Sequence, residues 1–167
     1  MLKYFSEELS AMKPIIFEIT GEIEAPAELV YQIIADYRDG HPHIVPKKYF
    51  KSLTVEQGGI GKGTIFVTET EAFGRKQTMR MHVTEPSPGS VLVETDYDLG
   101  IITTFTVTPD GENRSKLTLH TRSEPKPGLM GLIERFLSPG LLRKMYLAEF
   151  ETFNQYLRSN QYRAQST

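Results

Sequence analysis

The chain has 167 residues, of which 39% are hydrophobic and 24% are charged, and its formal net charge at pH 7 is -2. This is the composition of one globular domain, and it excludes a disordered chain; the interspersed charges also argue against a nucleic-acid-binding surface. The sequence contains no cysteine, which excludes disulfides and thiolate metal sites.

The N-terminal part predicts a leader followed by a strand. Residues 1–14 form the leader, with apolar residues at the spacing of a short helix that ends at Pro14. Charged side chains interrupt its apolar run, so it lacks the pattern of a signal peptide. We therefore expect a cytoplasmic protein without stable membrane insertion. From Ile15 to Glu24, apolar residues alternate as in a β-strand.

Two helical segments are predicted after this strand. Ala25-Pro26-Ala27-Glu28 has the proline and acidic residue typical of a helix start, and the helix ends by Asp39-Gly40. The next segment, HPHIVPKKYF, is broken by two prolines, which favours a short helix or loop. Its aromatic residues are candidates for the rim of a cavity.

The middle of the chain predicts an antiparallel meander. Alternating runs separated by glycine-containing turns give strands at 51–57, 64–72, 75–85, 90–97, 101–108 and 114–123. Connections this short cannot join parallel neighbours. A helix at 129–158, kinked near Pro139, is predicted to cover the sheet, because its apolar residues recur at helical spacing. Residues 159–167 lack this spacing, and we expect a frayed tail there.

This order of elements resembles the START/Bet v 1-like (SRPBCC) superfamily, specifically its polyketide cyclase/dehydrase and lipid-transport branch. The resemblance covers residues 15–158 and rests on the segments IEAPAELVYQIIADYRD, VEQGGIGKGTIF and FLSPGLLRKMYLAEFETFNQYL. It implies an α+β helix-grip fold, in which a curled antiparallel sheet of about seven strands wraps around a long C-terminal α-helix. It also implies two short helices after strand one. Residues 15–158 would then form a ligand-binding domain.

Motifs for nucleotides and metals are weak in this sequence. GGIGKGT lacks the spacing of a phosphate-binding loop and precedes a strand, so its glycines favour a tight turn. Asp36, Asp39, His41 and His43 lack the spacing of a metal site, which favours a solvated loop. We therefore predict neither a metal nor a cofactor.

Strand parity predicts an apolar cavity between the inward strand faces and the C-terminal helix. Glu69 is its sharpest polar candidate, because an apolar environment would raise the pKa of its carboxyl group; the alternative is a glutamate that reaches water at a strand end. The residues predicted to bind a ligand are Tyr37, Tyr49, Phe50, Ile65, Val67, Glu69, Met79, Met81, Val93, Thr95, Tyr97, Phe105, Leu132, Phe136 and Met145.

Three functions remain open at this point. The leading hypothesis is binding or transport of a small hydrophobic ligand, lipid-like or polycyclic, by a monomer or weak homodimer. The second is an enzyme similar to polyketide cyclases or dehydratases, with Glu69 and Tyr97 as catalytic residues. The third, which the resemblance also implies, is a protein-partner or quinone-binding chaperone module.

Overall fold

The computed structural model describes residues 14–124, 128 and 136–165. Its helices and strands are β1 (Ile16–Ile23), α2 (Ala27–Ala35), α3 (His41–Ile44), β2 (Phe50–Gln57), β3 (Ile65–Ala72), β4 (Arg75–Ser87), β5 (Val91–Asp96), β6 (Ile101–Pro109), β7 (Ser115–Ser123) and α5 (Pro139–Gln165). The predicted strands are therefore confirmed to within a few residues at each end.

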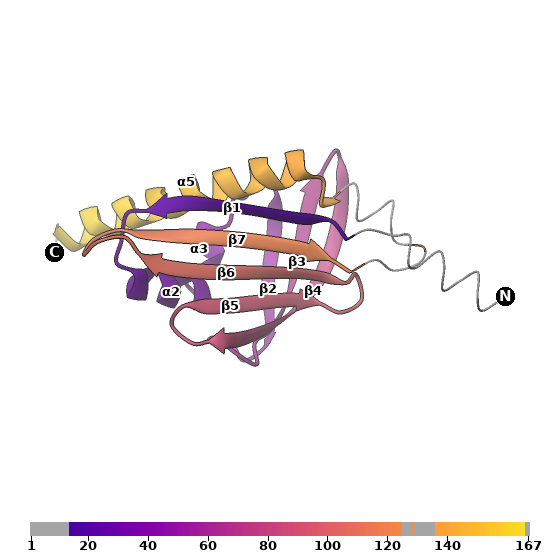
Figure 1. The fold of residues 1–167 in the computed structure, drawn as a ribbon, viewed down its shortest axis with the longest axis horizontal. Helices are drawn as coiled ribbons and strands as arrows, with labels where there is room; N and C mark the ends of the chain where they lie inside the picture. Colours follow the sequence, from indigo (N-terminus) through magenta and orange to yellow (C-terminus); the bar gives the residue numbers. More distant parts are fainter. Residues whose placement is uncertain (1–13, 125–127, 129–135, 166–167) are drawn as a thin grey trace.

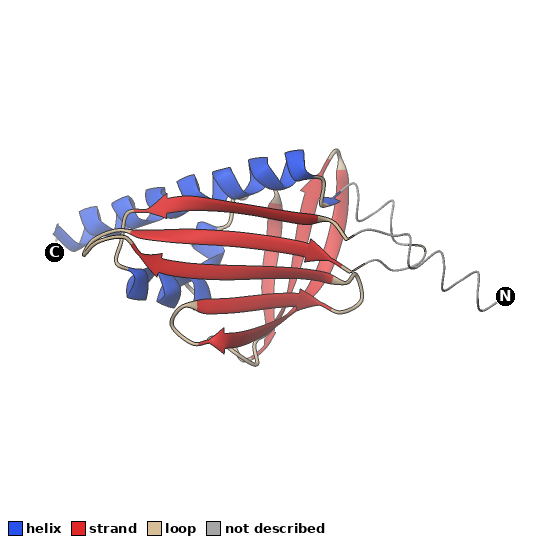
Figure 2. Cartoon of the chain, in the orientation of Figure 1, coloured by secondary structure: helices blue, strands red, loops and turns tan. Residues whose placement is uncertain are grey.

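The strands form one seven-stranded sheet in the order β1-β7-β6-β5-β4-β3-β2. Every neighbouring pair is antiparallel, and β1 pairs with β7 at the far end of the meander. The sheet curls but does not close: in Figure 1, β2 to β4 run steeply across the direction of β6, β7 and β1. The two short helices lie after β1, and α5 runs along the sheet (Figure 2). This is the helix-grip fold that the sequence predicted.

Two turns fix which side chains face the interior. Phe73-Gly74 is a two-residue hairpin turn with both residues at positive φ (53° and 69°), and it pairs Ala72 with Arg75. Between β5 and β6, the Asp96 carboxylate accepts hydrogen bonds from two backbone N–H groups of the turn, and Asp96 pairs with Ile101. Cross-strand partners share one face of a sheet. The first turn therefore fixes which residues of β3 and β4 share a face, and the second does the same for β5 and β6.

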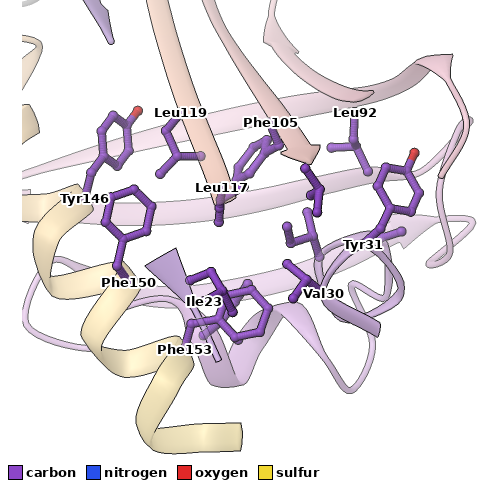
Figure 3. Packing of buried hydrophobic residues seen from close by; sticks show 14 of the residues in the cluster. Ile23, Val30, Tyr31, Leu92, Phe105, Leu117, Leu119, Tyr146, Phe150 and Phe153 are labelled. Atoms are coloured by element: carbon purple, nitrogen blue, oxygen red, sulfur yellow. The ribbon is translucent and has the colours of Figure 1, made fainter. Parts of the chain in front are cut away.

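The core lies between the concave face of the sheet and the apolar side of α5. Figure 3 shows Tyr146, Phe150 and Phe153 of α5 directed toward side chains of the sheet, including Leu117 and Leu119. These two leucines and Phe153 are all 0% exposed. Burial of such side chains contributes about 1.5–3 kcal/mol each, so the seam between helix and sheet is a major source of stability.

Hydrogen bonds attach the later part of α5 to the end of β1. The Asn154 side-chain amide accepts a bond from the Glu24 N–H at 2.9 Å and donates one to the Glu22 carbonyl at 3.0 Å. Arg158 adds an ion pair with the Glu24 carboxylate at 2.9 Å. The helix is thereby held in one position along the edge strand.

The helix α5 begins at Pro139, where the sequence predicted a kink, and a proline in the first turn of a helix needs no N–H partner. Phe136 is also helical, and the helical conformation is interrupted at Leu137 and Ser138. The predicted part at 129–135 lies outside the described residues, as does most of the predicted leader at 1–14. At the other end, α5 continues to Gln165, beyond the predicted helix end at 158. Within the described ranges, no helix combines the length and apolar character needed to span a membrane.

Candidate functional site

A cavity of about 80 Å³ lies between the concave face of the sheet, the segment after α2 and the first turns of α5. Its walls are mostly apolar, and they include aromatic, aliphatic and methionine side chains. The apolar lining residues are Val45, Phe50, Leu53, Phe66, Ala72, Met79, Met81, Leu99, Ile101, Phe105, Phe136, Leu137, Leu142 and Met145. Polar side chains interrupt this surface, and three of them are glutamates: Glu71, Glu94 and Glu149.

Glu94 reaches the cavity from the middle of β5. It lies opposite Thr103 of β6, and its side chain shares the inward face with Leu92. The residue is 7% exposed, and the Tyr37 hydroxyl donates a 2.6 Å hydrogen bond to its Oε1. Burial raises the pKa of the Glu94 carboxyl to about 7, although the bond from Tyr37 acts in the opposite direction. Glu94 is therefore close to half protonated at neutral pH.

His41, on α3, faces the same carboxyl group. Its Nδ1 lies 2.7 Å from the Ile34 carbonyl oxygen, which can only accept, so Nδ1 carries the proton of the neutral ring. The other nitrogen, Nε2, lies 3.7 Å from Glu94 Oε1. Burial lowers the pKa of His41 to about 4, so at neutral pH this contact is not a pair of opposite charges. His41 instead offers a lone pair to the cavity.

The glycine loop between β2 and β3 holds Tyr37 in place. The Gly59 carbonyl accepts the Tyr37 N–H at 2.9 Å, and Gly61 donates its N–H to the Ala35 carbonyl at 2.9 Å. A side chain at Gly59 would overlap Arg38, whose guanidinium donates to the Gly58 carbonyl. The loop thus packs against the end of α2 through its backbone, which explains the glycines without any phosphate ligand.

Glu149 approaches the cavity from α5. The residue is 2% exposed, and its Oε1 accepts no hydrogen bond within the described part of the chain. Burial, together with the nearby charge of Glu94, raises the pKa of the Glu149 carboxyl to about 8. Both glutamates can therefore hold a proton near neutral pH, and Glu149 has an unsatisfied acceptor inside an apolar enclosure.

A short line of hydroxyl groups lies beside Glu149. The Tyr146 hydroxyl is hydrogen-bonded to Thr121, whose hydroxyl lies 3.1 Å from that of Thr103. Burial raises the pKa of Tyr146, so its hydroxyl stays protonated. Tyr146, the two threonines, Glu94, Glu149 and His41 form a polar region of a mostly apolar cavity.

A family model described as polyketide cyclase / dehydrase and lipid transport matches residues 14–159. The chain belongs to this family. A search of curated protein sequences found no match.

Solved structures similar to this family member share its fold. The KanY protein, determined by NMR, has a TM-score of 0.73 and 23% identity, with 88% of this chain and 99% of that chain covered. The Zhui aromatase/cyclase from Streptomyces sp. R1128 has a TM-score of 0.68 and 17% identity, with 86% and 93% covered. A START superfamily protein from Mycobacterium smegmatis has a TM-score of 0.65 and 17% identity, with 86% and 97% covered.

The predicted ligand-binding residues of this polyketide cyclase/dehydrase family member fall into several groups. Those that line the cavity are Phe50, Met79, Met81, Phe105, Phe136 and Met145. Tyr37 is buried beside the cavity and donates a hydrogen bond to Glu94. Tyr49 packs in a neighbouring cluster with Phe136. Leu132 lies outside the described residues.

The prediction that the remaining candidates face inward was wrong. Ile65, Val67 and Glu69 lie on the face of β3 that points away from the cavity. Val93 and Thr95 lie on the corresponding face of β5, and Tyr97 follows the end of that strand. Glu69 forms an ion pair with Lys76 at 2.9 Å, and Tyr97 is 60% exposed with its ring against His82. The physical reason is the register of the strands. Met81 pairs with Phe66, and Phe105 pairs with Leu92, so Phe66 and Leu92 face the interior and their neighbours along each strand face outward.

Sequence reasoning missed Glu94, Glu149 and Tyr146, and it assigned His41 to a solvated loop. For Glu149 a signal was present. It lies four residues after Met145 and three after Tyr146, on the apolar stripe of the predicted helix. A carboxyl group on such a stripe is buried when the stripe is covered by a sheet.

Proposed function

We propose that this protein binds a small, mainly apolar molecule, of lipid-like or polycyclic character, in the cavity between the sheet and α5. The observation that supports this most directly is the composition of the cavity wall, which is mostly apolar and carries a limited set of polar side chains, among them Glu94 and Glu149. Binding sites for small organic molecules typically combine such walls with a few placed polar groups. The family description, which includes lipid transport, agrees with this role.

The cavity volume of about 80 Å³ implies that a ligand of this kind enters by moving side chains. Met79, Met81 and Met145 line the wall, and their unbranched thioether side chains change rotamer easily. A ligand that buries about 400 Å² of apolar surface would gain about 10 kcal/mol before the costs of association. Micromolar affinity is therefore attainable without a charged anchor.

A binding assay with a cavity-filling variant tests this proposal. Delipidated protein should bind fluorescent lipophilic probes, and native mass spectrometry of untreated protein should detect a co-purified apolar molecule. Met145→Phe places a larger side chain in the cavity wall and should weaken probe binding. Leu147→Phe is the matched control, because Leu147 lies on the same helix but is 46% exposed. Equal binding by both variants, or no binding across a broad panel of lipophiles, would refute the proposal.

A second candidate function, proton-transfer catalysis of the cyclase or dehydratase type, is favoured by the two buried carboxyl groups. Their pKa values of about 7 and 8 allow each to give or take a proton near neutral pH. Glu69 and Tyr97 cannot fill these roles inside the cavity, since both lie outside it. Turnover of a poly-β-ketone model substrate should fall at least about tenfold in Glu94→Gln or Glu149→Gln. Unchanged turnover in both variants would exclude this mechanism.

A further inference from the structure

We infer that the cavity prefers ligands whose polar end is a hydrogen-bond donor, above all a protonated amine, and disfavours carboxylates. This inference rests on the proposed function and adds the chemical class of the ligand. It begins with the Glu149 Oε1 atom, which lines the cavity, is almost completely buried and accepts no bond from any described residue. A buried acceptor without a donor is costly, and a ligand that supplies the donor removes that cost.

The groups that face Glu149 supply acceptors in excess. Glu94 Oε1 from β5 already accepts a hydrogen bond from the Tyr37 hydroxyl, and His41 from α3 presents the lone pair of Nε2 because its Nδ1–H donates to the Ile34 carbonyl. Tyr146 of α5 is engaged with Thr121. Among the described residues that line the cavity there is no lysine or arginine. A bound cation would therefore have no positive competitor.

The same arrangement acts against an anionic ligand. A carboxylate would enter a mostly apolar cavity that Glu71, Glu94 and Glu149 also line, and it would find no lysine or arginine among the described walls. It would have to give up its hydration without an opposite charge, or bind a proton first. An ammonium group, in contrast, can donate to Glu149 and pair with its charge.

Proton linkage gives the amine a distinct pH dependence. Free Glu149 is protonated below about pH 8 and must lose this proton to pair with an ammonium group. Amine affinity should therefore rise up to about tenfold per pH unit from pH 6 to 8 and then level off, with release of a proton on binding. Glu94 titrates near 7 and adds to this trend, whereas His41 is neutral throughout the range. A neutral alcohol should show no comparable increase.

The experiment compares three probes that share one apolar skeleton: 2-naphthylmethylamine, 2-naphthylmethanol and 2-naphthoate. Titration calorimetry of delipidated protein at pH 6, 7 and 8, in buffers with different ionisation enthalpies, measures affinity and proton release together. At pH 8 we expect the amine to bind at least about tenfold more tightly than the carboxylate. Glu149→Gln should reduce the pH dependence of the amine to the smaller part that Glu94 contributes and should retain alcohol binding. Glu151→Gln, an exposed position on the same helix, is the matched control and should behave as the wild type.

The outcomes separate the two proposals. If the carboxylate binds as tightly as the amine, or amine binding releases no proton, the inference is wrong while the apolar binding function stands. If none of the three probes binds at any pH, the binding function fails for ligands of this size and the inference fails with it. Should Glu149→Gln not fold, the pH series of the wild type decides the matter by itself.

Discussion

Replacing Glu149 by glutamine should change how the stability of the protein depends on pH. Glutamine has nearly the same shape but cannot ionise. In the wild type, burial raises the pKa of this carboxyl from 4.5 to about 8, so its stabilising contribution is complete below about pH 4.5 and is lost as the pH rises through 8. Between pH 5 and 7 the native state holds one proton that the unfolded chain has lost. The wild type therefore loses a little over 1 kcal/mol per pH unit from this group, or about 2–3 kcal/mol between pH 5 and 7.

Urea unfolding at pH 5, 6 and 7 measures this effect as a difference between two proteins. His41 gives an opposite slope, because its lowered pKa makes its contribution complete above 6.5 and lost as the pH falls toward 4. Since His41 is present in both proteins, its contribution cancels in the difference, whereas the coupling between Glu149 and Glu94 is part of the effect that is measured. The free energy of unfolding of the wild type, relative to that of Glu149→Gln, should fall by about 2–3 kcal/mol from pH 5 to 7. A difference that does not vary with pH would refute the reasoning, and Glu22→Gln, at an exposed position of β1, is the control that should show none.

Three further substitutions test other parts of the structure. Tyr37→Phe should lower the free energy of unfolding by about 1–3 kcal/mol, because a buried carboxyl loses its donor; it should also raise the pKa of Glu94 further above 4.5, as read by carbon-13 NMR of the carboxyl group. Gly21→Ala should cost about 1–3 kcal/mol in urea unfolding, since the new methyl group would overlap the Phe150 ring; partial recovery with Phe150→Leu would support this cause, and an unchanged stability would contradict it. Glu69→Gln removes an exposed ion pair and should change stability by less than about 1 kcal/mol. The same variant should leave probe affinity unaltered. A marked loss of affinity would show that Glu69 takes part in ligand binding.

The order and type of the elements could be predicted because the turns are explicit in the sequence. Which residues of each strand face the core was harder to predict, although the same turns determine it. A two-residue turn at Phe73-Gly74 pairs Met81 with Phe66, so an inward Met81 is incompatible with inward Ile65 and Val67. The turn after Asp96 excludes the combination of inward Phe105 and inward Val93 in the same way. Apolar and β-branched residues occupy both faces of these strands, so composition does not identify the buried face, and register has to decide.

The polar region of the cavity depends on contacts that no local pattern contains. Glu94 and Glu149 belong to β5 and α5, and they come together only because the helix crosses the concave face of the sheet. His41 was predicted to lie in a solvated loop because the spacing of Asp36, Asp39, His41 and His43 does not fit a metal site. It is buried because the Ile34 carbonyl and the Tyr37 ring, stacked 4.6 Å away, hold it against the core.

The energetics of this region also favour a functional interpretation over a structural one. Leu117, Leu119 and Phe153 stabilise the fold by burial, and apolar residues at the glutamate positions would do the same. Buried carboxyl groups instead cost stability above pH 5, and Glu149 has an oxygen that no described donor satisfies. Replacing buried charged groups by apolar ones is often neutral or stabilising. Two buried carboxyl groups depart from the apolar packing that stabilises the rest of the core. Departures of this kind are expected where a protein binds or transforms a ligand.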